Sequence, residues 1–211
     1  MATYTAYAKI DAHMDLVSKD ANYGATASVE LGGVFINDKS KFMRAIANFD
    51  VSALSGRTID NAELRMWRSG LSNPGFDATI YRCTRPDGWT EGGVTWNKYD
   101  GSSDWTDAGG DFDEVTPTPK AISALPSPGW NVFTGMKDFV TDAIDNRNGV
   151  VSLIIKADDE NPPQTAWVSW QANDASIDVW RFVIDHSGAP IGARRERGFV
   201  RGVQRGTLRG T

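Results

Sequence analysis

The chain has 211 residues, 40% of them hydrophobic, which is enough to bury one core and favours one domain. Its single cysteine, Cys83, excludes an intrachain disulfide framework. The first residues have no charged and apolar leader pattern, so we expect no secretion signal, and no stretch approaches the ~20 apolar residues of a membrane span. The net charge of −5 is unevenly spread: residues 194–211 hold six arginines and one glutamate, and the rest carries −10.

In chain order, apolar and polar residues alternate at residues 43–49, 62–67, 78–83 and 179–184, as in half-buried strands. Residues 150–156 form a nearly continuous apolar run, which is typical of a strand covered on both faces. Turn-forming pairs such as Gly32-Gly33, and glycine- and proline-rich stretches, separate these segments. Many short strands at such spacing predict an antiparallel β-sandwich or barrel.

One segment has the period of a helix. Met136, Phe139, Val140, Ala143 and Ile144 share one face of a helix that we predict at residues 135–146. Thr134 is a candidate cap at its start, and Gly149 is a candidate terminator after its end. The predicted fold class is therefore all-β, with one short helix at the edge of the sandwich.

Several motifs, in this order, resemble the DNRLRE (disaggregatase-related repeat) β-sandwich family, whose relatives include carbohydrate-binding modules. They are Asn22-Tyr23-Gly24, Arg44 through Asp50 with Ser52 and Leu54, Ile59 with Ala62 and Leu64, Trp89 through Asn97, the helix around Phe139-Val140, and the strands 166–171 and 178–184. The resemblance covers roughly residues 8–186 and implies a jelly-roll sandwich that serves as an accessory domain outside a cell. We therefore divide the chain into a jelly-roll domain, residues 1–188, and an extended C-terminal arm, residues 189–211.

The sequence predicts no catalytic site. Its two histidines, His13 and His186, have no partner at a metal-binding spacing, and His186 is expected in a solvated loop. Cys83 is interpreted as a small buried hydrophobe. Nucleophile-elbow and phosphate-binding motifs are absent. The acidic residues cluster in turns, where local hydrogen bonding accounts for them.

No cofactor is predicted, with the exception of one structural calcium ion. Asp11, Asp15 and Asp20 lie near the first strand, and Asp50 follows Phe49. Carboxylate oxygens from such loops suit Ca²⁺. The alternative is that these side chains cap turns and pair with Arg44 or with lysines, and the spacing is not that of an EF-hand.

Aromatic side chains are the candidate sugar contacts, because the C–H face of a pyranose ring is apolar and stacks on a flat aromatic ring. Trp105, in a polar loop, and Trp67, on the outward face of its strand, are the predicted glycan-binding residues. Trp89 and Trp96 are expected in the core. Exposed tryptophans serve protein contacts equally well.

The C-terminal arm has a four-residue Arg-Gly repeat that the family resemblance does not explain. Laid out as a strand, its arginines share one face, and apolar residues accompany them; the predicted subunit contacts are Arg197, Phe199, Arg201, Arg205, Leu208 and Arg209. The arm suits either an acidic face of a neighbouring subunit or nucleic acid phosphates, and the third possibility is a disordered solubilising tail.

Three functions follow from these features. The first is a non-enzymatic bacteriophage virion protein (a decoration, fibre-base or tail-associated subunit) that assembles in the host cytoplasm and docks to neighbouring subunits, as a homo-oligomer, through its arm. The second is a carbohydrate-binding module of an extracellular or cell-surface protein. The third is nucleic-acid binding through the arm, which the charge of −10 on the rest of the chain disfavours.

Overall fold

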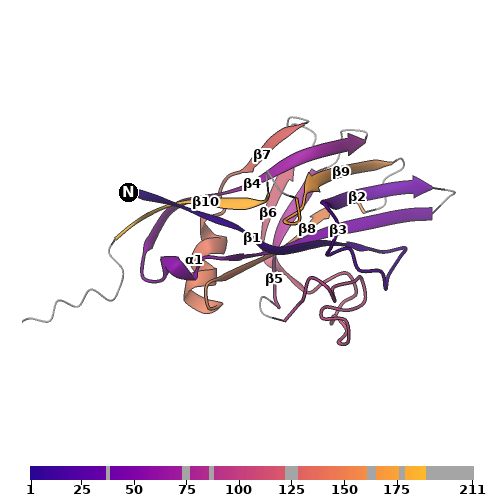
Figure 1. Cartoon of the computed structure of the whole chain (residues 1–211), viewed down its shortest axis with the longest axis horizontal. Helices are drawn as coiled ribbons and strands as arrows, with labels where there is room; N and C mark the ends of the chain where they lie inside the picture. The colour runs from indigo at the N-terminus through magenta and orange to yellow at the C-terminus, as the bar shows by residue number, and fades with distance from the viewer. Residues whose placement is uncertain are drawn as a thin grey trace, which may run out of the picture.

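The structure is a computed structural model that describes residues 1–36, 39–72, 77–85, 88–121, 128–160, 165–175 and 179–188. It confirms the all-β fold with one α-helix (Figure 1). The strands are β1 (Ala2–Asp15), β2 (Ser28–Ile36), β3 (Lys39–Asp50), β4 (Thr58–Ser72), β5 (Asp77–Cys83), β6 (Phe112–Ala121), β7 (Gly129–Phe133), β8 (Val150–Ala157), β9 (Ala166–Gln171) and β10 (Arg181–Ser187). A single 3-10 turn, Ser52–Leu54, follows β3, and helix α1 spans Lys137–Asn146.

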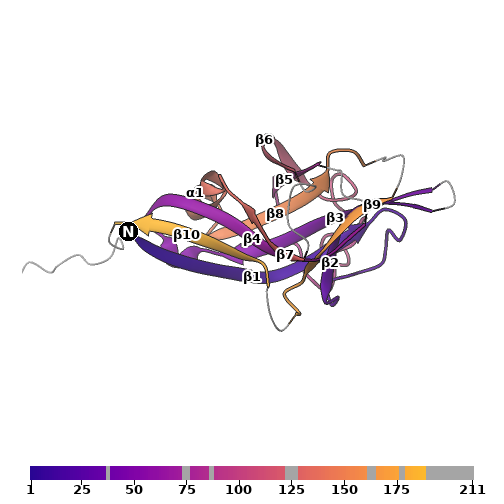
Figure 2. The same cartoon turned by 90° about the horizontal axis from the view of Figure 1, so that it is seen from above.

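Six of the strands form a closed ring in which every pairing is antiparallel. The order is β1–β10–β4–β9–β2–β3, and β3 pairs again with β1. Strands β8, β5 and β6 extend the sheet from β3, and β7 pairs with the other edge of β4. Figure 2 shows β10, near the end of the described chain, between β1 and β4. The first and last strands are therefore neighbours in the sheet.

Long strands close the ring because they change partners along their length. Residues 2–7 of β1 pair with β10, whereas residues 8–15 pair with β3, and the register shifts between Ala8 and Ile10. A register shift changes the side of the sheet to which the following side chains point. β1 consequently contributes to the interior of the ring through Ala6 and Ala8, and to a second apolar cluster through Ala12 and Met14.

The main core lies inside the ring, and the alternating patterns identify its residues. Trp180, Phe182 and Ile184 point inward from or beside β10, and each is 0% exposed. Edge-to-face aromatic pairs fix their packing: the Phe182 ring centroid is 4.8 Å from that of Phe49, and the Trp180 centroid is 5.8 Å from that of Trp170. The inward residues of β3 and β4 are also those that alternation predicts: Ala45, Ala47, Phe49, Ala62, Leu64 and Met66.

Helix α1 packs against β4 and β8 and buries Phe139, Val140 and Ala143 in the main core. The predicted helix is confirmed, and so is Gly149 after its end. Gly149 adopts a φ of 78°, and its N–H donates to the Ala143 carbonyl at 2.8 Å. The predicted Thr134 cap is wrong, because Met136 occupies the cap position and makes no side-chain hydrogen bond. Among the described residues, no helix is long and apolar enough to cross a bilayer.

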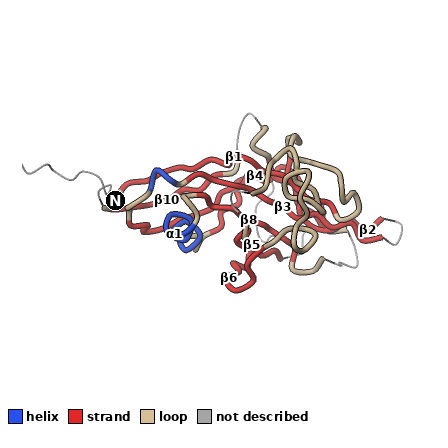
Figure 3. The backbone as a smooth tube through the Cα atoms, turned by 90° about the horizontal axis from the view of Figure 1, so that it is seen from below, coloured by secondary structure: helices blue, strands red, loops and turns tan. Residues whose placement is uncertain are grey.

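Residues 88–111 form a long loop that covers the outside of β1, β3 and β8. Figure 3 shows the loops gathered at the end of the molecule away from the N-terminus. The long loop builds a second cluster in which Trp89, Val94, Trp96 and Trp105 pack on the outward side chains of the sheet. The Trp89 Nε1–H donates to Asn48 Oδ1 of β3 at 2.9 Å and to Ser152 Oγ of β8 at 3.2 Å. The loop is therefore part of the folded body, and Trp89 and Trp96 are buried as predicted.

The segment after β1 holds the long loop in place through Asn22 and Gly24. The Asn22 side-chain amide donates to the Glu91 and Val94 carbonyls, both at 2.7 Å. Gly24 lies so close to Glu91 that a Cβ would overlap the Glu91 backbone. A Gly24→Ala substitution must therefore push the loop away from this segment.

We predict that Gly24→Ala lowers the free energy of unfolding by about 1–3 kcal/mol, as overpacking does in other proteins. Gly92→Ala is the matched control in the same loop, because a Cβ there meets nothing within 4 Å. We expect that control to stay within about 0.5 kcal/mol of the wild type. Urea unfolding of the wild type and the two variants measures these free energies of unfolding. Equal stability of the two variants would contradict the close contact between Gly24 and the Glu91 backbone.

Candidate functional site

Trp105, one of the two predicted glycan contacts, is 5% exposed and belongs to the second apolar cluster. Its Nε1–H donates to the Thr95 carbonyl at 3.0 Å, and its ring lies 5.6 Å from that of Tyr99. A buried ring offers no face to a sugar. The expectation that Trp105 is exposed is therefore wrong.

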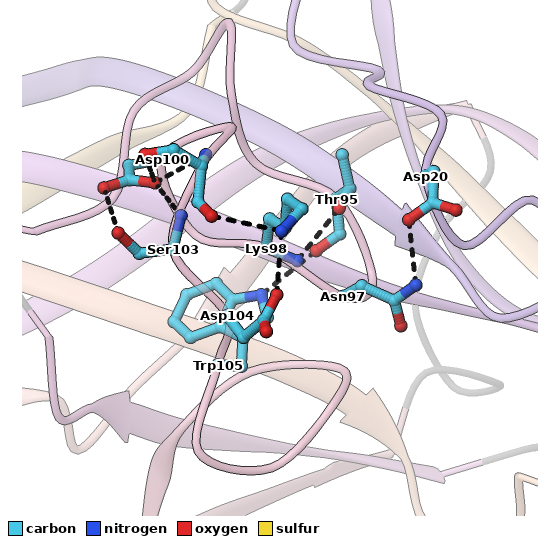
Figure 4. A network of polar contacts seen from close by, with 9 residues as sticks. Asp20, Thr95, Asn97, Lys98, Asp100, Ser103, Asp104 and Trp105 are labelled. Atoms are coloured by element: carbon cyan, nitrogen blue, oxygen red, sulfur yellow. Dashed lines mark hydrogen bonds and ion pairs between the residues drawn. The ribbon is translucent and has the colours of Figure 1, made fainter.

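The polar residues around Trp105 misled the prediction because they bond to one another. Asp100 accepts hydrogen bonds from the Ser102 and Ser103 backbone N–H groups at 2.8 and 2.6 Å, and Lys98 pairs with Asp104 at 2.9 Å (Figure 4). The bonds to the serines lower the pKa of Asp100 to about 2. These turns close over the tryptophan, so a polar sequence surrounds a buried side chain.

The four carboxylates proposed as calcium ligands make separate local bonds. Asp20 accepts from Asn97 at 2.8 Å, and Asp50 accepts from the Ser52 N–H and hydroxyl at 2.9 and 2.6 Å. Asp15 accepts from the Val17 N–H at 2.9 Å. Within the described ranges, no group of three or more acidic, histidine or cysteine side chains is arranged to hold a metal. The structure does not bring these carboxylates together as one ligand set.

Asp11 is the fourth of these carboxylates and has an unusual environment. It is 1% exposed and accepts the Asn173 N–H at 2.6 Å, while its own backbone N–H donates to Glu91 Oε1 at 3.0 Å. Burial, together with the charges of Glu91 and Asp174, raises the pKa of Asp11 to about 7. Burial also raises the pKa of Glu91. Asp11 thus connects β1 to the long loop and to the segment before β10.

Trp67, the other predicted glycan contact, lies on the outward side of β4 and is half-buried. Its register partner on β7 is Trp130, and the two ring centroids are 5.6 Å apart with their planes at 77°. The Arg181 guanidinium of β10 lies 4.0 Å from the Trp130 ring centroid. This arrangement is a cation–π contact added to an edge-to-face pair.

The outward residues of β1, β10, β4 and β7 together form a surface that we call the outer face. One register row crosses all four strands, from Tyr7 through Arg181 and Arg65 to Val132. Tyr7 is 54% exposed and Val132 is 40% exposed, and among the described large hydrophobic residues only four reach this level of exposure. Sequence reasoning identified Trp67 alone, because register decides which residues of distant strands share a row.

A second surface feature is a groove of about 760 Å³ beside the long loop. Phe112, Arg44 and Lys156 line it, together with the acidic residues Asp107, Asp113 and Glu114. The Arg44 guanidinium is already committed: it donates to both Glu160 oxygens at 2.7 and 2.8 Å and to the Gly109 carbonyl at 3.0 Å. Phe112 has cations against its ring, since Arg44 and Lys156 lie 5.5 and 5.0 Å from its centroid.

The two histidines and the cysteine pack against other residues of the fold. His13 stacks on Tyr23 with ring centroids 4.3 Å apart. His186 is 9% exposed, so the expectation of a solvated loop is wrong: β10 continues to Ser187, three residues beyond the predicted alternating segment 179–184. Cys83 is fully buried on β5, and burial raises the pKa of its thiol.

The six predicted arm contacts lie outside the described residues, so subunit docking by the arm stays a prediction.

The pKa of Asp11 predicts a pH dependence of stability. Above the ordinary aspartate pKa of 3.8, the unfolded chain releases a proton that the folded protein retains up to about pH 7. Rising pH therefore favours unfolding across this window, by up to about 1.4 kcal/mol per pH unit. Asp11→Asn removes the titrating group, so its stability relative to the wild type should increase from pH 4 to pH 7. Urea unfolding at several pH values tests this, and a pH-independent difference would contradict it.

Comparison with known proteins bears on the first half of the chain. A family model described as carbohydrate-binding module family 96 matches residues 2–106, which hold β1 to β5 and most of the long loop. No curated protein sequence matches the chain. The match includes Tyr7, Arg65 and Trp67 of the outer face, whereas Trp130 and Arg181 lie beyond it. Residues 2–106 are therefore similar to a carbohydrate-binding module, which is a binding domain, while the DNRLRE resemblance and a virion origin stay predictions.

Proposed function

We propose that the protein binds carbohydrate through its outer face. The observation that carries this proposal is the arrangement of Tyr7, Trp67, Trp130 and Arg181 on one face of the sheet. Sugars present apolar C–H faces beside hydroxyl groups, so a site for them combines aromatic rings with hydrogen-bonding side chains. The match to carbohydrate-binding module family 96 supports the same function independently of this geometry.

The outer face supplies both kinds of contact. Tyr7 and Val132 present exposed apolar surface, and exposed apolar residues gathered on one face often mark a binding site. Arg65 is held by Glu63, whose Oε2 lies 2.8 Å from the Arg65 Nη2 atom. Arg181 is held against Trp130. These contacts orient the guanidinium groups before a ligand arrives, which lowers the entropy cost of binding.

The groove beside the long loop is a weaker candidate for the same function. Its Arg44 donates to a carboxylate and a carbonyl within the protein, and its Phe112 ring is partly covered by Arg44 and Lys156. A ligand there would have to displace existing contacts. On the outer face Arg181 likewise covers the Trp130 ring, but Tyr7 and Val132 are exposed there without such a contact having to be displaced.

Among the three functions considered from the sequence, the comparisons favour carbohydrate binding over a virion role. The outer face recognises the sugar, and the long loop with its buried tryptophans supports the sheet. The arm, residues 189–211, has no part in the proposed site.

We predict that Tyr7→Ala lowers affinity for a bound polysaccharide about tenfold or more, which corresponds to about 1.4 kcal/mol. Its fold should be unaffected, because the side chain is 54% exposed. Val17→Ala is the matched control: Val17 is 55% exposed and lies ten residues further along the chain, beyond β1. We expect it to bind as the wild type does.

Affinity gel electrophoresis against a panel of soluble neutral and acidic polysaccharides would first identify the polysaccharide that the wild type retains. Isothermal titration with that polysaccharide then gives the affinities of the variants. Trp67→Ala is a second test of the face, with circular dichroism as the check on folding because Trp67 is half-buried. Unchanged affinity of both folded variants would exclude the outer face.

A further inference from the structure

We infer that the outer face binds the interior of a single extended polysaccharide chain, which lies across the four strands. This inference rests on the proposed function and specifies the ligand's form. It concerns how much of a polymer the site contacts and whether the site needs a chain end. Three features of the outer face lead to it: the register row, the exposure of the two ends of that row, and the angle between the tryptophan rings.

The row from Tyr7 to Val132 sets the length of the site. It crosses β1, β10, β4 and β7 through three consecutive register pairings. Neighbouring strands are ~4.8 Å apart, so the two ends of the row are roughly 14 Å apart. A single sugar ring is shorter than this distance. One monosaccharide therefore cannot contact Tyr7 and Val132 together.

The side chains of the row are apolar at its two ends and charged between them. Tyr7 and Val132 are its exposed ends, while Arg181 and Arg65 lie between them and are half-buried. The side chain of Arg181 follows the same direction, since it starts on β10 and reaches the ring of Trp130 on β7. Two apolar contacts separated by hydrogen-bond donors match successive rings of one chain, in which apolar faces alternate with hydroxyl-bearing edges.

Both ends of the row are open at the level of the sheet. Among the described strands, β7 pairs with β4 alone. Residues 2–7 of β1 pair with β10 alone, because the β3 pairing begins at Ala8. No further strand continues the sheet past either end of the row in the part of the chain that the structure describes. No described strand therefore stands in the way of a polymer that runs past the two ends of the row, as binding to a chain interior requires.

The two tryptophans argue against a flat crystalline ligand. A platform for a crystal surface needs coplanar rings, but the Trp67 and Trp130 planes meet at 77°. Only one of the two can lie parallel to a given surface. One chain can bend past such a pair, whereas the rigid face of a crystal cannot.

The test uses the soluble polysaccharide that the wild type retains most strongly in the panel. Partial hydrolysis supplies its oligomers from monomer to octamer, and borohydride reduction of the octamer alters its reducing end. Isothermal titration is expected to show affinity that rises by at least tenfold from the monomer and then reaches a plateau. Reduction of the octamer should change its affinity less than twofold, because the site makes no contact with the chain end.

Variants at the two ends of the row give the second arm of the test. Tyr7→Ala should weaken octamer binding about tenfold, as it does for the polysaccharide, and Val132→Ser should weaken it severalfold, with Val17→Ala as the exposed control. Microcrystalline cellulose and chitin should retain no more of the wild type than of Tyr7→Ala.

The outcomes separate this inference from the proposed function. Monomer affinity equal to octamer affinity, or loss of binding on reduction, would overturn the extended-chain inference. The outer face would still stand as the glycan site if Tyr7→Ala remained defective. If a crystalline polysaccharide retained the wild type but not Tyr7→Ala, the inference that the ligand is a single chain would be overturned. Absence of binding to every polysaccharide in the panel would overturn the proposed function together with this inference.

Discussion

The insertion of β10 between β1 and β4 is the constraint on which the rest of the structure depends. Its inward residues, Phe182 and Ile184, join Trp180 in the main core, and its outward residue Arg181 links Tyr7 to Arg65 in register. Because side chains alternate along a strand, one short segment supplies both the core and the centre of the outer face. A slip of one residue would exchange the two sets, so burial of the aromatic residues also fixes the position of Arg181.

The alternating pattern predicted much of this fold because it reports directly on burial. Ala62, Leu64 and Met66 face the core and Trp67 does not, as their spacing indicates. The helix was predictable for the same reason, since its apolar residues recur on one face. Register between distant strands leaves no such local signal, and so the row from Tyr7 to Val132 could be found only in the structure.

Two other parts of the site show where local reasoning fails. β7 has only five residues, and its polar Asn131 lies on the buried side beside Phe133 while Val132 is exposed, the opposite of what alternation indicates. Asn131 is polar yet buried, because it accepts the Trp170 Nε1–H at 3.0 Å. Trp105 shows the reverse case, a buried ring in a polar segment. In both places, hydrogen bonds inside the protein satisfy polar groups that a sequence pattern would assign to solvent.

The central position of β10 also has a consequence for how the chain acquires its structure. During synthesis, β1 and β4 emerge long before the strand that joins them, so their facing edges stay unpaired until Ser187 has left the ribosome. Unpaired edges on a nascent chain invite pairing with other chains. Contacts between residues so distant in sequence also slow folding, toward the millisecond-to-second range of β-sandwiches. Closure of the ring therefore requires translation of its last strand, and the charge of −10 on residues 1–193 opposes association between chains until then.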